Sequence, residues 1–122
     1  MGYRSTVGIK CQSGAYEKFK AAWDRNMFSP HKILTDDNQT EYILIWEWVK
    51  WNDFYEEVAA IEQVMDELDE YANDEAWENK MAYKKLELGE DDTDVTHRQN
   101  SYNISLYYIR EIDTDGMKEL RL

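Results

Sequence analysis

Alternating hydrophobic and polar positions divide much of this chain into short segments that are typical of β-strands. The alternation predicts strands at 3–11, 31–35 and 41–49, because successive side chains of a strand point to opposite faces of a sheet. Segment 41–49 is apolar on both faces, which is typical of a strand in the middle of a sheet. Weaker patterns of the same kind predict two further strands, at 81–88 and 102–112.

Between these segments the hydrophobic spacing changes to a period of three to four residues, which predicts two helices. The first helix covers about 14–25, with Ser13 as its N-cap, and ends before Pro30. The second begins near Asp53, which together with Glu56 forms an Asp-based variant of the capping box. The apolar stripe of this second helix comprises Phe54, Val58, Ile61, Met65 and Leu68.

The order of these elements is β-α-β-β-α-β-β. It predicts an α+β fold in which two helices cover one face of an antiparallel sheet, a ferredoxin-like arrangement or a related one. The 122 residues are the length of one domain. We expect polar connections at 73–80 and 89–100, and a turn followed by a frayed tail at 113–122.

The formal charge of −12 comes almost entirely from one part of the chain. Residues 53–94 hold 16 acids and three Lys, a net of −13, and no Lys or Arg lies between Asp53 and Asn79. Such a field repels nucleic acid and anionic membranes, so we expect neither as a direct partner. The charge serves either as a solvated face that aids solubility or as a surface complementary to a basic partner.

Four acids of the second predicted helix are our candidates for partner binding: Glu62, Asp66, Glu67 and Glu70. Like charges three or four residues apart on a helix repel each other, so a face of one sign lowers stability and points to a use for it. Carboxylates at this spacing can imitate the charges of a nucleic-acid backbone. Trp51, just ahead of the helix, is a further candidate. We expect replacement of the four acids to leave the fold intact or slightly more stable.

Motifs for nucleophilic, phosphate-binding, dinucleotide-binding or zinc chemistry are absent from the sequence, so we predict neither an enzyme nor a cofactor. The densest set of oxygen ligands lies in segment 90–97, where Asp91, Asp92 and Asp94 are weak metal candidates. Their spacing does not fit a calcium-binding loop, and a solvated hairpin loop is the preferred interpretation. A small nucleotide- or metal-handling protein that uses this segment remains an alternative.

The single cysteine, Cys11, excludes an internal disulfide and favours a reducing compartment. Its phase in the first strand predicts a buried side chain. The chain contains no long apolar run, so we expect a cytoplasmic protein that does not span a membrane. The aromatic side chains of Trp46 and Trp48 are expected to pack in the core against the helices.

Four short motifs resemble a group of small acidic proteins of bacteriophages and prophages that begin with the same five residues. The motifs are Met1–Ser5, Trp46–Trp51, Met65–Glu70 and Leu88–Asp91. The resemblance spans 1–112, with a departure at 72–80, and implies a viral origin without a chemical activity. The hypothesis is therefore a phage-encoded accessory protein that binds a basic host protein in the host cytoplasm. A structural, virion-associated oligomer is a further alternative.

Overall fold

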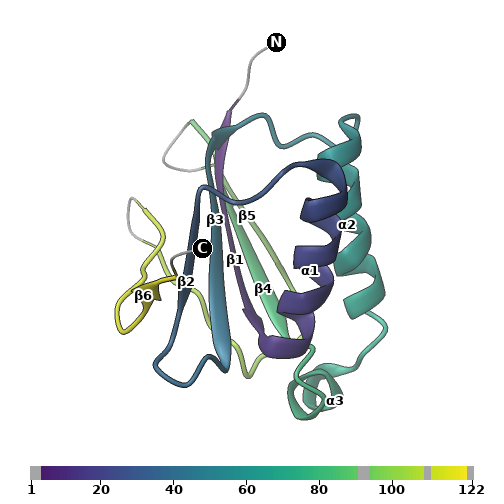
Figure 1. The fold of residues 1–122 in the computed structure, drawn as a ribbon, viewed down its shortest axis with the longest axis vertical. Helices are drawn as coiled ribbons and strands as arrows, with labels where there is room; N and C mark the ends of the chain where they lie inside the picture. Colours follow the sequence, from purple (N-terminus) through teal and green to yellow (C-terminus); the bar gives the residue numbers. More distant parts are fainter. Residues whose placement is uncertain (1–3, 91–93, 109–110, 121–122) are drawn as a thin grey trace.

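A computed structural model describes residues 4–90, 94–108 and 111–120 of the chain. These residues form an α+β fold whose strands make one antiparallel sheet in the order β5-β4-β1-β3-β2-β6 (Figure 1). The elements in chain order are β1 (Ser5–Gln12), α1 (Ser13–Asn26), β2 (Lys32–Thr35), β3 (Glu41–Val49), α2 (Glu56–Leu68), α3 (Asn73–Glu78), β4 (Tyr83–Leu88), β5 (Val95–Gln99) and β6 (Lys118–Glu119).

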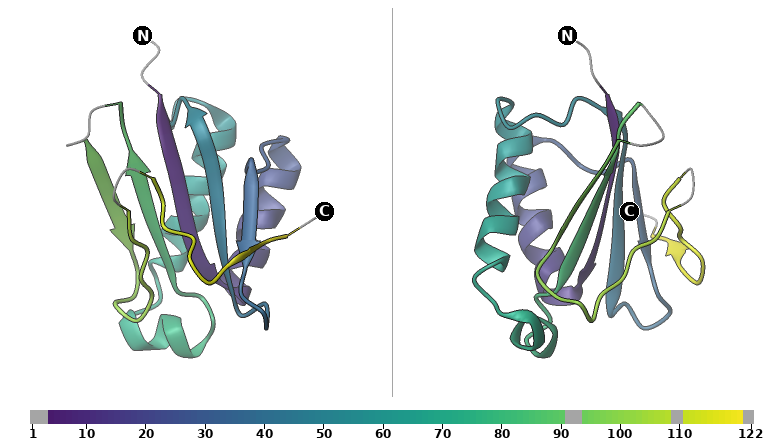
Figure 2. Two further views of the ribbon diagram at one scale, coloured as in Figure 1. Left: turned by 90° about the vertical axis from the view of Figure 1, so that its left-hand side faces the viewer. Right: turned by 180° about the vertical axis from the view of Figure 1, so that it is seen from behind.

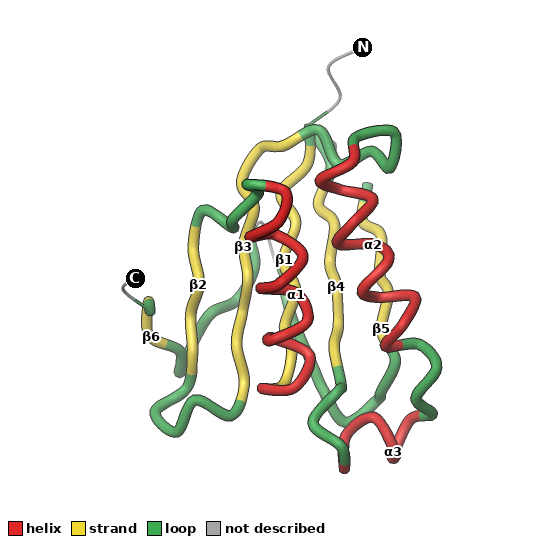
Figure 3. The backbone as a smooth tube through the Cα atoms, turned by 45° about the vertical axis from the view of Figure 1, so that its right-hand side comes forward, coloured by secondary structure: helices red, strands yellow, loops and turns green. Residues whose placement is uncertain are grey.

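Both faces of the sheet are covered, but by different kinds of structure. Helices α1 and α2 lie side by side on one face (Figure 3), and the C-terminal segment crosses the other (Figure 2). The core on the helix side includes the buried side chains of Phe19, Leu44, Trp46, Ile61, Met65 and Tyr83. The core on the opposite side is smaller and consists of Leu34, Ile43, Ile45, Leu86, Leu106 and Ile112.

The strands predicted at the start, middle and second half of the chain are confirmed as β1, β2, β3 and β4. The prediction of a central position for 41–49 is also confirmed, since β3 pairs with both β1 and β2. Leu44 belongs to the core on the helix side and Ile43 to the core on the opposite side. Cys11 is buried in β1 as expected, and burial raises the pKa of its thiol.

The second half of the chain differs from the prediction in four places. Segment 89–100 contains β5 and is not only a loop, and 73–80 contains the short helix α3. Segment 113–122 contributes the two-residue strand β6, which pairs with β2. Segment 102–112 is irregular, with one isolated bridge between Tyr108 and Ile112. Two of its apolar residues, Leu106 and Ile112, pack on the sheet and produce the alternating pattern. In most of the described part of this segment, however, the backbone pairs with no neighbouring strand.

Both helices begin differently from what their sequence signals predict. Ser13 is the first residue of α1 and Gln12 is the N-cap, without a hydrogen bond from its side chain to the helix. Helix α2 begins at Glu56 with Tyr55 as its N-cap, so Asp53 does not cap it. Phe54 lies outside the helix and is 91% exposed, and Val64 takes part in the buried stripe instead.

A β-bulge near the end of β3 changes the direction of Trp48. The register joins Val7 to Trp46 but Ser5 to Val49, so β3 contains one extra residue between the pairs. Trp48 has a φ of 54°, a left-handed conformation that is uncommon for a bulky side chain. Trp46 is fully buried as predicted, whereas the prediction that Trp48 packs in the core is wrong, since its side chain is 56% exposed. The bulge reverses the strand's alternation at this point.

None of the described helices is long and apolar enough to cross a membrane.

Candidate functional site

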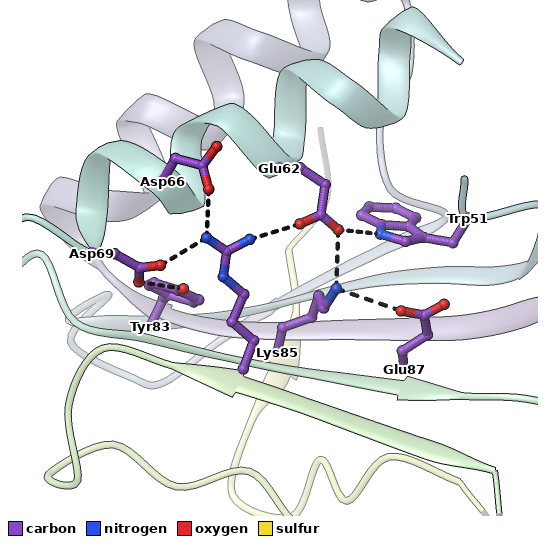
Figure 4. A network of polar contacts seen from close by, with 8 residues as sticks. Trp51, Glu62, Asp66, Asp69, Tyr83, Lys85 and Glu87 are labelled. Atoms are coloured by element: carbon purple, nitrogen blue, oxygen red, sulfur yellow. Dashed lines mark hydrogen bonds and ion pairs between the residues drawn. The ribbon is translucent and has the colours of Figure 1, made fainter. Parts of the chain in front are cut away.

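A polar network joins α2 to the sheet at the edge formed by β4 and β5 (Figure 4). At its centre lies Lys85 of β4, which is 4% exposed. The Lys85 ammonium donates hydrogen bonds to Glu62 Oε1 at 3.0 Å and to Glu87 Oε2 at 3.5 Å. The indole Nε1 of Trp51 donates to the same Glu62 oxygen at 2.6 Å, and the Lys85 ammonium lies 5.8 Å from the centre of the Trp51 ring.

Arg98 of β5 binds three carboxylates of the helix side. Its Nη1 donates to Glu62 Oε2 at 2.9 Å, and its Nη2 donates to Asp66 Oδ1 at 2.6 Å and to Asp69 Oδ2 at 2.7 Å. Partial burial alone would lower the pKa of this guanidinium, but the hydrogen bonds to Asp69 and Asp66 raise it. The three contacts make Arg98 the main counter-charge of α2.

Tyr83 extends the network into the core beneath the helices. Its hydroxyl donates to Asp69 Oδ1 at 2.6 Å. Burial, and next the hydrogen bond to Asp69, raise the pKa of this phenol. Tyr83 therefore remains a neutral donor far into the alkaline range, and Asp69 accepts from both Tyr83 and Arg98.

The local structure explains why these side chains meet. Lys85 and Arg98 are directly paired neighbours in the antiparallel register of β4 and β5. Glu62, Asp66 and Asp69 follow each other at intervals of four and three residues, which places them on one side of the helix. These three carboxylates, called the inner acids below, face the two cations of the sheet. The network contains no buried side-chain nitrogen or oxygen without a hydrogen bond, a statement that holds for all described residues.

A second set of carboxylates points away from the sheet. These residues, called the outer acids below, are all exposed and comprise Glu56 and Glu67 of α2, Glu70 in the turn that follows it, and Asp74, Glu75 and Glu78 of α3. Glu67 has a distant cation in Lys18 of α1, with 3.9 Å between Nζ and Oε2. Asp74 accepts from the side-chain amide of Asn103 at 3.2 Å. Most acids of this region therefore belong either to a set paired with cations of the sheet or to a set exposed to solvent.

The structure divides the five residues that the sequence proposes for partner binding. Glu62 and Trp51 are half-buried and bonded inside the network, and Trp51 also packs against Trp46. Asp66 has both roles, because it pairs with Arg98 while 70% of its side chain is exposed. Glu67 and Glu70 belong to the outer acids. The expectation that replacing all four acids leaves the fold intact does not take into account that Glu62 binds Lys85 and Arg98.

Sequence reasoning missed Lys85 and Arg98 as the partners of the helix. The available signal is weak, because segment 81–88 offers two lysines, Lys84 and Lys85, and the sequence predicts a loop around Arg98. Without strand β5 there was no register to bring Arg98 beside Lys85. From the sequence alone, the acids of α2 therefore have no visible counter-charge and are expected to repel one another.

An open hollow of ≈ 520 Å³ lies beside the network and is lined mainly by its polar side chains, including Trp51, Glu62 and Arg98. Within the described part of the chain, no group of three or more His, Cys, Asp or Glu side chains could hold a metal ion. The metal candidates Asp91 and Asp92 lie outside the described residues. Asp94 is exposed next to β5, and His97 is part of that strand and not of a loop.

Comparison with models of known protein families, with curated proteins and with solved structures found no match to this chain.

Proposed function

We propose that this protein is an accessory protein of a bacteriophage or prophage that binds a basic host protein through its outer acids. The observation that carries the proposal is the sorting of carboxylates on α2 and α3. The inner acids have cationic partners in the sheet, whereas the outer acids face solvent on a segment without Lys or Arg between Asp53 and Asn79. The opening residues Met1–Ser5 and the other short motifs support the viral origin.

The charge distribution favours recognition of a cationic surface. Arg98 and Lys85 offset two of the three inner charges at hydrogen-bond distance, which weakens the field of the inner acids. The outer acids are compensated weakly, so they dominate the potential on the helix side of the molecule. A surface of one sign accelerates association with a partner of opposite sign and disfavours wrong partners.

The partner that fits this chemistry is a host protein with a basic cleft, such as one that binds nucleic acid. Carboxylates on two successive helices then occupy positions that backbone phosphates would take, and the protein acts as a nucleic-acid mimic in the host cytoplasm. The same charge excludes direct binding to nucleic acid. We also assign the β1-to-β4 part of the sheet, with α1 and α2, to the ferredoxin-like class on the basis of its order β4-β1-β3-β2.

Partner capture from a bacterial lysate with matched charge variants tests the proposal. The test variant carries Glu67→Lys, Glu70→Lys and Glu75→Lys, all outer acids whose side chains take no part in the described bonds of the network. The control variant carries the same change in charge at exposed positions elsewhere, through Glu17→Lys, Asp37→Lys and Asp94→Lys. Retained proteins are identified by mass spectrometry after nuclease treatment.

We expect wild type and control to retain the same basic protein and the test variant to lose it. Retention should weaken as salt rises from about 0.1 M to about 1 M, because the screening length falls from about 10 Å to about 3 Å. Equal retention by the test variant and the control would refute the proposal and leave the outer acids as a solubility feature.

A further inference from the structure

A pocket of ≈ 480 Å³ lies on the face of the sheet that α1 and α2 do not cover. It is bounded by β2 and β3 on one side and by the C-terminal segment and β6 on the other. In Figure 2 the C-terminal segment crosses this face toward β2, which accounts for the wall of the pocket. The pocket is separate from the polar network and from the outer acids, with which it shares no lining residue.

The floor and one wall of the pocket are apolar. Leu34, Ile45 and Ile112 supply aliphatic carbon from three different parts of the chain. The indole of Trp48 lines the same pocket and remains 56% exposed, because the bulge directs it to this side of β3. A large aromatic ring in a left-handed backbone conformation costs stability that a smaller residue would not.

The polar lining is dominated by carboxylates. Glu47, Glu111 and Glu119 line the pocket together with Lys32, whose ammonium lies 3.1 Å from Glu47 Oε1. The hydrogen bond and charge of Glu47 raise the pKa of Lys32, and the charges of Glu119 and Glu111 raise it further. Three carboxylates therefore share one ammonium among the described lining residues, and these residues carry an excess of negative charge around the apolar floor.

We propose that this pocket binds the side chain of a Lys or Arg residue in an extended basic segment of a partner protein. The Trp48 ring offers its face to the cation, and the carboxylates of Glu111 and Glu119 offer charge-assisted hydrogen bonds. The aliphatic floor accepts the methylene stem, which in long cationic side chains packs on apolar surface while the head stays polar.

Charge and shape together select this occupant over others. An anionic group would be repelled by the three carboxylates. A purely apolar side chain would displace water from these carboxylates without replacing the hydrogen bonds that the water makes. Lys32 already demonstrates the preference, since its ammonium lies among the same three acids. The inference does not depend on the outer acids, because none of them lines the pocket and α2 lies on the opposite face of the sheet (Figure 3).

Titration with a short synthetic peptide tests the pocket directly. The probe is acetyl-Gly-Lys-Gly-Lys-Gly-amide, and its matched control replaces both lysines by norleucine, which keeps the stem but removes the charge. Binding is followed at low salt through the NMR signal of the Trp48 indole N–H. The signal is assigned by its loss in Trp48→Gly, a substitution suited to the left-handed backbone at this position.

We expect saturable binding of the lysine peptide and binding of the norleucine peptide at least about tenfold weaker. Trp48→Gly and Glu119→Gln should each weaken the lysine peptide by about tenfold, with the first variant followed through neighbouring backbone signals. Glu70→Gln, which changes an outer acid by the same charge, should leave its binding unchanged. Equal binding of both peptides, or unchanged binding by Trp48→Gly and Glu119→Gln, would overturn the proposal.

Discussion

Lys85 illustrates how a single buried charge positions the whole acidic helix. Its ammonium is almost inaccessible and is held by Glu62 and Glu87, with the Trp51 ring beside it. Taking a charged group out of water is costly, and the cost is met only when its partners remain in place. These contacts therefore fix the position of α2 on β4. They need not add net stability, but loss of one partner leaves the other charge buried and unpaired.

Tyr83 gives the protein a sensitivity to alkaline pH. Burial and the hydrogen bond to Asp69 raise the pKa of the phenol above its usual value of about 10. Because the folded pKa is raised, the stabilisation is complete below about pH 10 and is lost as pH rises through the folded value, since the unfolded chain releases the proton first. We expect urea unfolding to show a stability that decreases steadily above about pH 10.

Tyr83→Phe is the variant that isolates this effect. It should be less stable at pH 7 by about 1 kcal/mol, because the hydrogen bond to Asp69 is lost. Its stability should also fall less steeply in alkali, with a residual slope from Cys11, Tyr16 and Tyr42, whose pKa values burial also raises. The same alkaline slope in wild type and variant would contradict the assignment to Tyr83.

At the scale of elements, the docking of the C-terminal segment depends on Gly8 of β1. A methyl group at this position would lie 2.2 Å from Ile112 Cδ1, closer than two carbon atoms can approach. Gly8→Ala should therefore force the Ile112 side chain out of its present position and lower the free energy of unfolding by up to about 2 kcal/mol. Urea unfolding measures the loss.

The double variant Gly8→Ala/Ile112→Ala provides the control for this prediction. Removing the clashing side chain should make the alanine at position 8 tolerable, so the double variant should be no less stable than Ile112→Ala alone. Losses that simply add in the double variant would mean that Gly8 and Ile112 do not meet as described.

The elements that the sequence predicts correctly are those with a hydrophobic period, strong in β1, β3, α1 and α2 and weaker in β4. Each of them buries an apolar face against the core, and this face produces the period. β5 is an edge strand with mostly exposed or half-buried side chains, and β6 has only two residues, so neither has a usable pattern. In segment 102–112 the sequence predicts a strand that is absent from the described residues, because apolar side chains can cover a sheet without a paired backbone.

The candidate site was predictable only in part for the same reason. The acids of α2 are evident from the sequence, but their division depends on Arg98, which needs β5 and its register with β4. The position of Trp48 depends on a bulge, and one extra residue reverses the direction of every side chain that follows. Tertiary contacts, and not local pattern, decide which charges and aromatic rings are available to a partner.

At the scale of the whole molecule, the two faces of the sheet support different proposed contacts. Outward-facing carboxylates dominate the helix side, whereas an aromatic and acidic pocket lies on the side of the C-terminal segment. Both surfaces suit basic partners, yet no residue is common to them. The account of the helix side depends on one physical claim, that loss of an inner acid destabilises the fold and loss of an outer acid does not.

Thermal unfolding of Glu62→Gln and Glu70→Gln tests that claim most directly, because each variant removes one charge with almost no change in shape. Glu62→Gln weakens contacts to Lys85 and Arg98 and should lose about 2 kcal/mol, which lowers Tm by roughly 5–10 °C. Glu70→Gln should leave Tm unchanged or raise it slightly, because it relieves repulsion among exposed acids. Equal shifts in the two variants, or a larger loss for Glu70→Gln, would contradict the sorting of the acids and the function proposed from it.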